Sequence, residues 1–394
     1  MRVLHILHGF SMGGAETLVK DYLLCMNQMG VECKVLCFDK WYGSPLEKWV
    51  QEAGIPIVNV RDQCPSWIKH LGLIGKGIIW LKKFTGTKKE IVAWKPDVIH
   101  THLYVNSYLY FALGKKPFYG QSGRRTVLFH TVHSEPSALW PAICGKYDSV
   151  KKTAHYYATQ KLVRYQNMRF IALHGLMREE LNRVFLTDNT VVLNNGIDFE
   201  RFEKPRDANE VRAELHIPKD AFLLGHVGRM AEVKNHRKVV GVFKEVHKRN
   251  PNSYLLLVGD GQLEPDIRKT VLENGLENWT VFLSNRGDVP SLMNAMDVFL
   301  FPSQFEGLGI VLIEAQKAKL PCVISDTVPG HAIISNYVRV KKLTEDDAAW
   351  ADAVLSPFPD SISYTNLEEW DIQRVVKKLL ALYREEMMKS EGKQ

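Results

Sequence analysis

The sequence predicts an α/β fold made of two consecutive doubly wound, Rossmann-like domains. A chain of 394 residues is too long for one ordinary hydrophobic core. Short apolar runs bounded by turn residues alternate with longer amphipathic stretches, which is typical of βαβ units around a parallel sheet. This alternation stops once, at residues 194–198 and the charged stretch after them, and then begins again. We therefore expect one domain over residues 1–198 and a second over residues 199–370, with ligand at the carboxyl ends of the strands.

The N-terminal half contains a series of short apolar runs that we interpret as strands. They are residues 3–8, 32–38, 56–60, 98–101, 126–131, 170–173 and 190–193. Residues 11–14 are expected to form a loop after the first strand, and residues 15–30 the helix that follows. The uncharged stretch over residues 98–114 contains two histidines, an asparagine and a serine. It therefore predicts a buried strand and a helix rather than a membrane span.

The C-terminal half repeats the same alternation after the break. Its expected strands are residues 222–228, 254–258, 280–283, 298–301 and 321–325. Its expected helices are residues 237–249, 263–274, 289–295 and 308–317, and residues 370–383 have the pattern of one more amphipathic helix.

The composition is that of a globular protein, with 45% hydrophobic and 24% charged residues. Residues 1–200 hold 25 Lys and Arg against 16 Asp and Glu, whereas residues 201–394 hold 26 against 28. All of the excess positive charge therefore lies in the N-terminal half and predicts an anionic partner there. Six cysteines without a Cys-x-x-Cys pair or zinc-site spacing indicate reduced thiols in a cytoplasmic protein. The N-terminus does not have the pattern of a signal peptide.

A basic segment lies within this N-terminal half, over residues 69–95. Seven lysines there face a single acidic residue, Glu90: Lys69, Lys76, Lys82, Lys83, Lys88, Lys89 and Lys95. Isoleucine, leucine, tryptophan and phenylalanine residues interleave with them. This pattern fits an element that lies on an anionic membrane surface, at the inner face of the plasma membrane. It fits a lysine-rich helix packed on the sheet equally well, and both interpretations stay open.

The sharpest chemical signal is a loop and helix start that carry two glutamates, Glu306 and Glu314. Gly307 and Gly309 lie between them and allow backbone N–H groups to approach an anion closely. The N-terminus of the expected helix adds the positive end of its dipole. Eight helical positions rise about 12 Å, roughly the distance from a reacting sugar past a diphosphate to a ribose. The alternative is an amphipathic helix with two solvated glutamates.

A second signal follows the first expected strand of the C-terminal half. The strand runs directly into Arg229 and Lys234, and Asn235 is placed to cap the next helix. Two fixed cations at the carboxyl end of a strand can neutralise a departing nucleoside diphosphate. An exposed basic loop is the simpler explanation for either cation alone, and a weaker one for both.

These motifs, taken together and in order, resemble family-4 retaining glycosyltransferases of GT-B fold, of the bacterial capsular or exopolysaccharide type. The resemblance covers nearly the whole chain. It rests on the Glu306/Glu314 and Arg229/Lys234 motifs, the Asn-Gly-Ile-Asp junction at 195–198, Gly-Gly-Ala-Glu at 13–16, and residues 97–102, 131–134 and 256–261. It implies two Rossmann-like domains facing across a cleft, and a last helix, within residues 371–394, that packs back on the first domain.

The resemblance also implies roles for individual residues of the C-terminal half. Arg229 and Lys234 would hold the donor diphosphate, Glu314 would accept hydrogen bonds from the ribose, and Glu306 would face the transferred sugar. Backbone amides would contact the phosphates or the sugar; they belong to Gly307, Leu308, Gly309 and Ile310.

In the N-terminal half, Gly13 and Gly14 would close over the phosphates, and His133 would lie by the sugar near the acceptor. His100 and His102 are interpreted as structural or cleft-lining residues. The implied donor is a nucleoside-diphosphate sugar, with a UDP-sugar expected, and the acceptor is a glycan or a lipid-pyrophosphate-linked glycan. No nucleic-acid partner is expected, since no binding motif is present.

The sequence departs from the family pattern at two places. The run from Asp326 to His331 lacks a glutamate that many relatives carry, and Lys319 stands where a glycine is usual. The first departure leaves recognition of the donor sugar open.

No Asp-x-Asp occurs in the chain, so we expect no metal and no cofactor. Arg229, Lys234 and a helix N-terminus would stabilise the leaving group electrostatically instead.

Three other functions are weighed against sugar transfer. A nucleotide-sugar 2-epimerase of GT-B fold would use the same donor site without an acceptor. An NAD-dependent dehydrogenase would need Gly-x-Gly-x-x-Gly, which residues 9–14 do not fit. A basic nucleic-acid binder is disfavoured because the C-terminal half is acidic.

Overall fold

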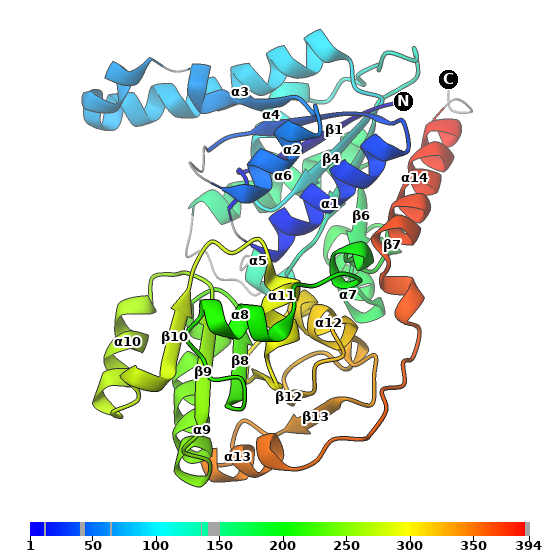
Figure 1. The fold of residues 1–394 in the computed structure, drawn as a ribbon. Helices are drawn as coiled ribbons and strands as arrows, with labels where there is room; N and C mark the ends of the chain where they lie inside the picture. Colours follow the sequence, from blue (N-terminus) through cyan, green and yellow to red (C-terminus); the bar gives the residue numbers. More distant parts are fainter. Residues whose placement is uncertain (12, 40–43, 64, 135, 141–149, 391–394) are drawn as a thin grey trace. The chain divides into compact units, whose positions relative to one another are not determined.

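The computed structural model describes residues 1–11, 13–39, 44–63, 65–134, 136–140 and 150–390. The chain divides into two compact units (Figure 1). Unit 1 consists of Met1–Gly196 together with Ile372–Gln394, and unit 2 of Ile197–Asp371. The change from unit 1 to unit 2 comes two residues before the boundary expected at residue 198. The C-terminal segment belongs to unit 1.

Unit 1 is built on a parallel sheet in the order β3-β2-β1-β4-β5-β6-β7. Its strands are β1 (Arg2–Leu7), β2 (Glu32–Cys37), β3 (Ile57–Asn59), β4 (Val98–His102), β5 (Val127–Thr131), β6 (Arg169–Ala172) and β7 (Thr190–Val192). The strand order reverses between β1 and β4, which is the topological switch point of a doubly wound sheet. In register, His5 on β1 lies beside His100 on β4.

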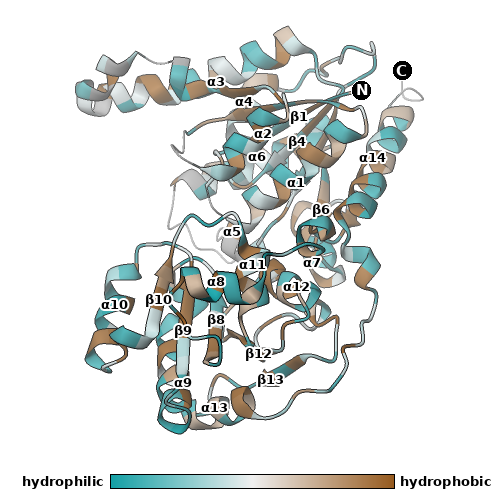
Figure 2. Cartoon of the chain, viewed as in Figure 1, coloured by the Kyte–Doolittle hydropathy of each residue, from teal (hydrophilic) through white to brown (hydrophobic). Residues whose placement is uncertain are grey.

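The helices of unit 1 connect these strands and cover the sheet. They are α1 (Gly14–Gln28), α2 (Pro45–Glu52), α3 (Gly72–Trp94), α4 (Asn106–Leu113), α5 (Pro136–Leu139), α6 (Val150–Gln166), α7 (Gly175–Phe185) and α14 (Ile372–Lys389). Helix α14, drawn in red in Figure 1, packs against α1 and β5. Its buried residues join one hydrophobic cluster with those of α1, β1 and β2. Figure 2 shows hydrophobic and hydrophilic residues alternating along α14, as expected of an amphipathic helix.

Unit 2 repeats the same architecture with a parallel sheet in the order β10-β9-β8-β11-β12-β13. Its strands are β8 (Phe222–Val227), β9 (Ser253–Val258), β10 (Thr280–Leu283), β11 (Val298–Phe301), β12 (Cys322–Ser325) and β13 (Val338–Lys341). Its helices are α8 (Ala208–Glu214), α9 (His236–Arg249), α10 (Glu264–Glu273), α11 (Val289–Ala295), α12 (Ile310–Lys317) and α13 (Asp347–Leu355). Here the strand order reverses between β8 and β11.

The described part of the chain contains no helix long and apolar enough to cross a membrane. The uncharged stretch over residues 98–114 forms β4, whose residues are all buried, and then α4. Cys25, Cys33, Cys37 and Cys322 are buried, and burial raises the pKa of the Cys33 thiol to about 12. Cys64 and Cys144 lie outside the described residues.

Candidate active site

The two motifs of the C-terminal half meet at the switch point of unit 2. Arg229 follows β8 by two residues, and Glu306 lies in the loop after β11, the neighbouring strand. The loops are joined by a backbone hydrogen bond of 2.8 Å from the amide of Gln304 to the carbonyl of Val233. In doubly wound folds, ligands bind in this crevice at the carboxyl ends of the strands. The two predicted motifs therefore lie at neighbouring strand ends of one sheet.

Arg229 is an exposed cation that close backbone packing holds at the end of β8. Gly259 and Gly261 adopt φ angles of +145° and +154°, and their Cα atoms face the backbone next to Arg229. A Cβ at Gly259 would lie 2.1 Å from the carbonyl oxygen of Gly228, so only glycine fits there. Within the described residues, the guanidinium of Arg229 has no acidic partner and is available to an anionic ligand.

Lys234 and Glu306 form an ion pair, with 2.6 Å between Lys234 Nζ and Glu306 Oε1. Their side chains are 18% and 10% exposed, so the pair is largely shielded from water. Lys234 Nζ also lies 4.9 Å from the centre of the Phe301 ring. The predicted phosphate ligand and the predicted sugar-facing carboxylate are therefore in direct contact. A phosphate that reaches Lys234 has to share it with Glu306.

Asn235 occupies the N-terminal cap position of α9, but its side chain makes no capping hydrogen bond. The prediction that it caps the helix is wrong in this respect. Its backbone is left-handed, with a φ of 54°, and its Nδ2 donates to the carbonyl of Pro302 over 3.2 Å. The side chain thus joins the loop after β8 to the end of β11 and helps to fix Lys234 near Glu306.

Helix α12 begins at Ile310, two residues later than expected, because Gly309 is left-handed with a φ of +75°. Glu306 therefore lies outside the helix, and the estimate of 12 Å from helical rise does not apply to the Glu306–Glu314 pair. Glu314 is half-buried in the second turn of α12.

The backbone before α12 provides donors for an anion. Leu308 is buried and anchors the loop, while Gly307 and Ile310 are half-buried. Within the described part of the chain, no hydrogen bond is found for the amides of Gly307, Leu308 and Gly309. Unpaired amides ahead of a helix start are suited to bind an oxyanion.

In unit 1, Gly13 and Gly14 lie where β1 turns into α1. Gly13 is the cap residue, in an extended conformation with a φ of −134°, and Gly14 starts the helix. The carboxylate of Glu16 accepts a hydrogen bond of 2.7 Å from the Ser11 hydroxyl, which ties the loop to the first turn. The glycine loop thus lies at the switch point of its own sheet.

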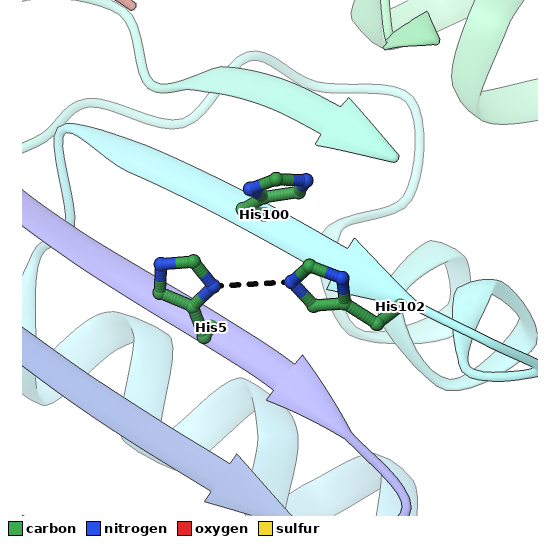
Figure 3. A group of neighbouring side chains, drawn as sticks. All are labelled: His5, His100 and His102. Carbon is green, nitrogen blue, oxygen red and sulfur yellow. Dashed lines mark hydrogen bonds between the residues drawn. The ribbon is translucent and has the colours of Figure 1, made fainter. Parts of the chain in front are cut away.

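His133 follows β5 by two residues and is half-buried. Its Nε2 lies 3.0 Å from His102 Nδ1. His102 Nε2 in turn lies 3.1 Å from His5 Nδ1, and this second bond is drawn in Figure 3. Burial lowers the pKa of His133 to about 4 and that of His5 to about 3, so both are neutral near pH 7. Sequence reasoning identified His133 and treated His102 as structural. It missed His5, because nothing in the sequence pairs the middle of β1 with β4.

Nitrogens of His5, His100 and His102 lie within 4.8 Å of one another, a spacing that a metal ion could accept. Both nitrogens of His100 already have partners: Nδ1 lies 2.5 Å from the Tyr383 hydroxyl, and Nε2 lies 2.7 Å from the Thr131 hydroxyl. Both nitrogens of His102 have partners as well. A metal would have to break these bonds in a fully buried place, and among the described residues the group with metal-ligand spacing holds imidazoles and no carboxylate, so the donor set fits a hydrogen-bonded cluster better.

Two family models match this chain. The model of Glycosyltransferase Family 4 matches residues 12–201, and that of Glycosyl transferases group 1 matches residues 207–369. Together they take in nearly the whole chain, and each falls on one of the two units.

The chain is also similar to individual proteins. It is 35% identical over 184 residues to EpsF of Bacillus subtilis, which is named as a glycosyltransferase; the match covers 46% of each chain. It is 27% identical over 284 residues to an Escherichia coli protein named UDP-Gal:alpha-D-GlcNAc-diphosphoundecaprenol alpha-1,3-galactosyltransferase, covering 69% of this chain and 67% of that protein. The chain thus spans about half the length of the Bacillus relative and two thirds of the Escherichia coli relative.

Among solved structures, Alr3699/HepE of Anabaena in complex with UDP-glucose superposes with a TM-score of 0.68 at 16% identity, and all of both chains is covered. This likeness shows a shared fold. The chain therefore belongs to the glycosyltransferases of GT-B fold that combine a family 4 N-terminal region with a group 1 C-terminal region.

Proposed function

We propose that the chain transfers a sugar from a UDP-sugar to a glycan or a lipid-pyrophosphate-linked glycan, with retention of anomeric configuration, in polysaccharide biosynthesis. The observation that carries this proposal is the cation set at the switch point of unit 2. Arg229, Lys234 and the unpaired amides before α12 lie on neighbouring loops, where a diphosphate would be held and its departure stabilised. The name of the Escherichia coli relative and the UDP-glucose bound in HepE support the donor and acceptor classes.

The Lys234–Glu306 contact supports different roles for the two residues in this mechanism. A donor phosphate would draw Lys234 toward itself and leave Glu306 facing the sugar, where positive charge develops in an oxocarbenium-like transition state. In this mechanism Glu306 stabilises the developing charge and is not assigned as a covalent nucleophile.

A donor panel tests this function. The protein is incubated with UDP-glucose, UDP-galactose, UDP-N-acetylglucosamine and GDP-mannose, and release of nucleoside diphosphate is followed. Slow release from one donor supports transfer. Conversion of a UDP-sugar into its C2 epimer would indicate the 2-epimerase instead, and the family matches favour transfer over it. No release and no interconversion with any of the donors would contradict the proposal.

The proposed mechanism uses no metal. Arg229, Lys234 and the start of α12 supply the positive charge that a divalent ion would otherwise supply. We expect donor turnover to be unchanged in excess EDTA. Loss of most activity on chelation, with recovery on addition of Mn²⁺ or Mg²⁺, would show that electrostatic replacement of the metal is wrong.

We also propose that α3 binds an anionic membrane surface, where a lipid-linked acceptor would lie. Among the described residues of α3, four large apolar side chains are exposed: Ile74 (71%), Trp80 (54%), Leu81 (58%) and Val92 (51%). Lys76, Lys82, Lys88 and Lys89 are exposed on the same helix. Lys83 differs, because it is mostly buried and pairs with Asp39 over 3.2 Å. It therefore belongs to the fold of unit 1.

Changing Lys76, Lys82, Lys88 and Lys89 to Gln should weaken binding to phosphatidylserine vesicles. Each lysine near an anionic surface contributes about 1 kcal/mol, so the loss should be several kcal/mol at low salt and less at 0.15 M salt. Cosedimentation measures the binding, and donor hydrolysis in solution should stay at the parental rate. The control changes four exposed lysines of unit 2 to Gln: Lys204, Lys219, Lys248 and Lys269. Equal binding by parent and α3 variant, or equal loss in the control, would contradict this role of α3.

A further inference from the structure

Three histidines of unit 1 form a continuous chain of hydrogen bonds, which we call the histidine relay: His5, His102 and His133. His5 lies in β1, His102 ends β4, and His133 follows β5. The two bonds have N···N distances of 3.1 and 3.0 Å, within the range of good hydrogen bonds. Figure 3 shows the His5–His102 bond with the His100 ring beside it. His100 is not part of the relay, because Tyr383 and Thr131 occupy its two nitrogens.

All three rings of the relay are neutral. Burial lowers the pKa of His5 and of His133, as described above, and it lowers the pKa of His102 well below its usual value, with further lowering from the neighbouring histidines. A neutral imidazole carries one proton, so one ring nitrogen donates and the other accepts. The tautomer of each ring is therefore set by the bonds of its neighbours.

Counting protons leaves two arrangements. Three neutral rings hold three protons, and each of the two bonds uses one. The third proton lies at one end, either on His5 Nε2 or on His133 Nδ1. In the first case every ring is protonated on Nε2, and in the second every ring is protonated on Nδ1. The three tautomers are thus locked together, and the two ends decide which one is present.

The two ends differ in their surroundings. Neither His5 Nε2 nor His133 Nδ1 has a hydrogen-bond partner among the described residues. His5 is completely buried, so a proton on Nε2 would be an orphaned donor in the sheet, which folded proteins rarely tolerate. His133 Nδ1 is shielded from water as well, but the residue is partly exposed on the loop after β5, at the edge of the sheet where ligands bind in doubly wound folds.

We propose that His5 and His102 are positioning residues that hold His133 in the Nδ1–H tautomer, so that it donates a hydrogen bond to an oxygen of the bound ligand. The proposal rests on the proposed function only for the identity of that ligand, a hydroxyl or phosphate oxygen of the sugar donor. In this state His133 has no lone pair directed outward. It binds and orients its ligand as a neutral donor and does not remove a proton.

The tautomers can be read directly by NMR on the full-length protein, selectively labelled with ¹⁵N-histidine, at pH 7.5 without ligand. Long-range ¹H–¹⁵N correlations distinguish protonated from unprotonated ring nitrogens, and His→Gln variants at 5, 102 and 133 assign the signals. We expect all three rings to be protonated on Nδ1. A proton on Nε2 of His133 would overturn the donor assignment, and mixed tautomers along the chain would overturn the relay.

Two variants of His102 test the positioning role. In His102→Asn, the carboxamide nitrogen takes the place of Nδ1 and can still donate to His133 Nε2, whereas His102→Leu has no donor. We expect Leu to convert part of His133 to the Nε2–H tautomer and to lower kcat/KM for the donor by about tenfold, as for one lost hydrogen bond. Asn should stay within about threefold of the parent and keep the Nδ1–H signal.

A matched control uses His130, a buried neighbour bonded to Thr101 and outside the relay. His130→Leu should leave the His133 tautomer unchanged. Equal loss of activity in His102→Asn and His102→Leu, with the His133 signal unchanged in both, would show a packing role only. The spectrum of the parent protein decides the tautomer even where a variant does not fold. This spectrum requires no enzymatic activity. If none of the donors released nucleoside diphosphate, the proposed function would be contradicted, but the tautomers of the relay could still be measured.

Discussion

Deletion of residues 371–394 is expected to unfold unit 1. Helix α14 is the only part of the C-terminal segment with described helical structure, and seven of its side chains are at most 6% exposed: Ile372, Val375, Val376, Leu379, Leu380, Tyr383 and Met387. Burial of each contributes about 1.5–3 kcal/mol. Their sum reaches or exceeds the ~5–15 kcal/mol by which a typical domain is stable.

Polar contacts of α14 are lost in the same deletion. The Tyr383 hydroxyl bonds His100 in the middle of the sheet, and Glu386 pairs with Arg169 over 2.7 Å. Without α14, His100 Nδ1 and the Arg169 guanidinium would be left without these partners in a largely buried place. Unit 2 has its own core and should keep its own transition.

Differential scanning calorimetry of the truncated protein measures this effect. We expect the transition of unit 1 to disappear and rapid proteolysis within residues 1–196. Leu379→Ala is the graded version and should cost about 2–5 kcal/mol of unfolding free energy. Lys377→Ala, an exposed substitution on the same helix, should change it by less than about 0.5 kcal/mol. A truncated protein that melts at the parental temperature would contradict this role of α14.

The strands that carry the site could be predicted from sequence because they are buried on both faces. Residues 280–283 and 298–301 are β10 and β11 with the expected bounds, and the other expected strands differ by one residue at one or both ends. Strand β13 was missed, because this short edge strand, Val338–Lys341, has half-exposed and exposed residues and two cations. A run of apolar residues predicts a strand even at the edge of a sheet, as for β10, whereas a short run interrupted by two cations does not.

The position of the candidate site in the fold could be predicted from the sequence, whereas most of its side-chain contacts could not. Strand-end cations and a glycine-containing loop are local patterns, so Arg229, Lys234 and residues 306–310 could be found in the sequence. The Lys234–Glu306 bond joins residues 72 positions apart, and the His5–His102 bond residues 97 apart. Such contacts depend on which strands are neighbours. The order β8–β11 and β1–β4 brings them together, and a single sequence does not give that order.

The largest expected effect on activity is that of Glu306→Gln, which should lower kcat on the order of a hundredfold or more with KM nearly constant. Glu306 would face the sugar while positive charge develops at the anomeric centre, so its charge matters most in the transition state. The glutamine can still accept a hydrogen bond from Lys234 Nζ, so the loop should keep its conformation. The variant thus removes a charge and little else.

Glu314→Gln should behave differently, since the ribose that Glu314 would contact does not change during the reaction. A lost charged hydrogen bond of about 1.5–3 kcal/mol should raise the donor KM by about tenfold or more, with kcat little changed. Arg229→Ala should lower kcat as Glu306→Gln does. It should also weaken binding of free UDP, because the exposed guanidinium would contact the diphosphate before and after transfer.

Steady-state kinetics on these variants, with calorimetric titration of UDP, separates the roles. The matched control is Glu277→Gln, the same chemical change at an exposed glutamate of unit 2 outside the site, and it should keep the parental kcat and KM. If Glu306→Gln keeps the parental kcat, the catalytic role assigned to Glu306 is wrong. The loop between β11 and α12 would then only bind the donor, and the Lys234–Glu306 pair would serve to hold Lys234 in place until a phosphate arrives.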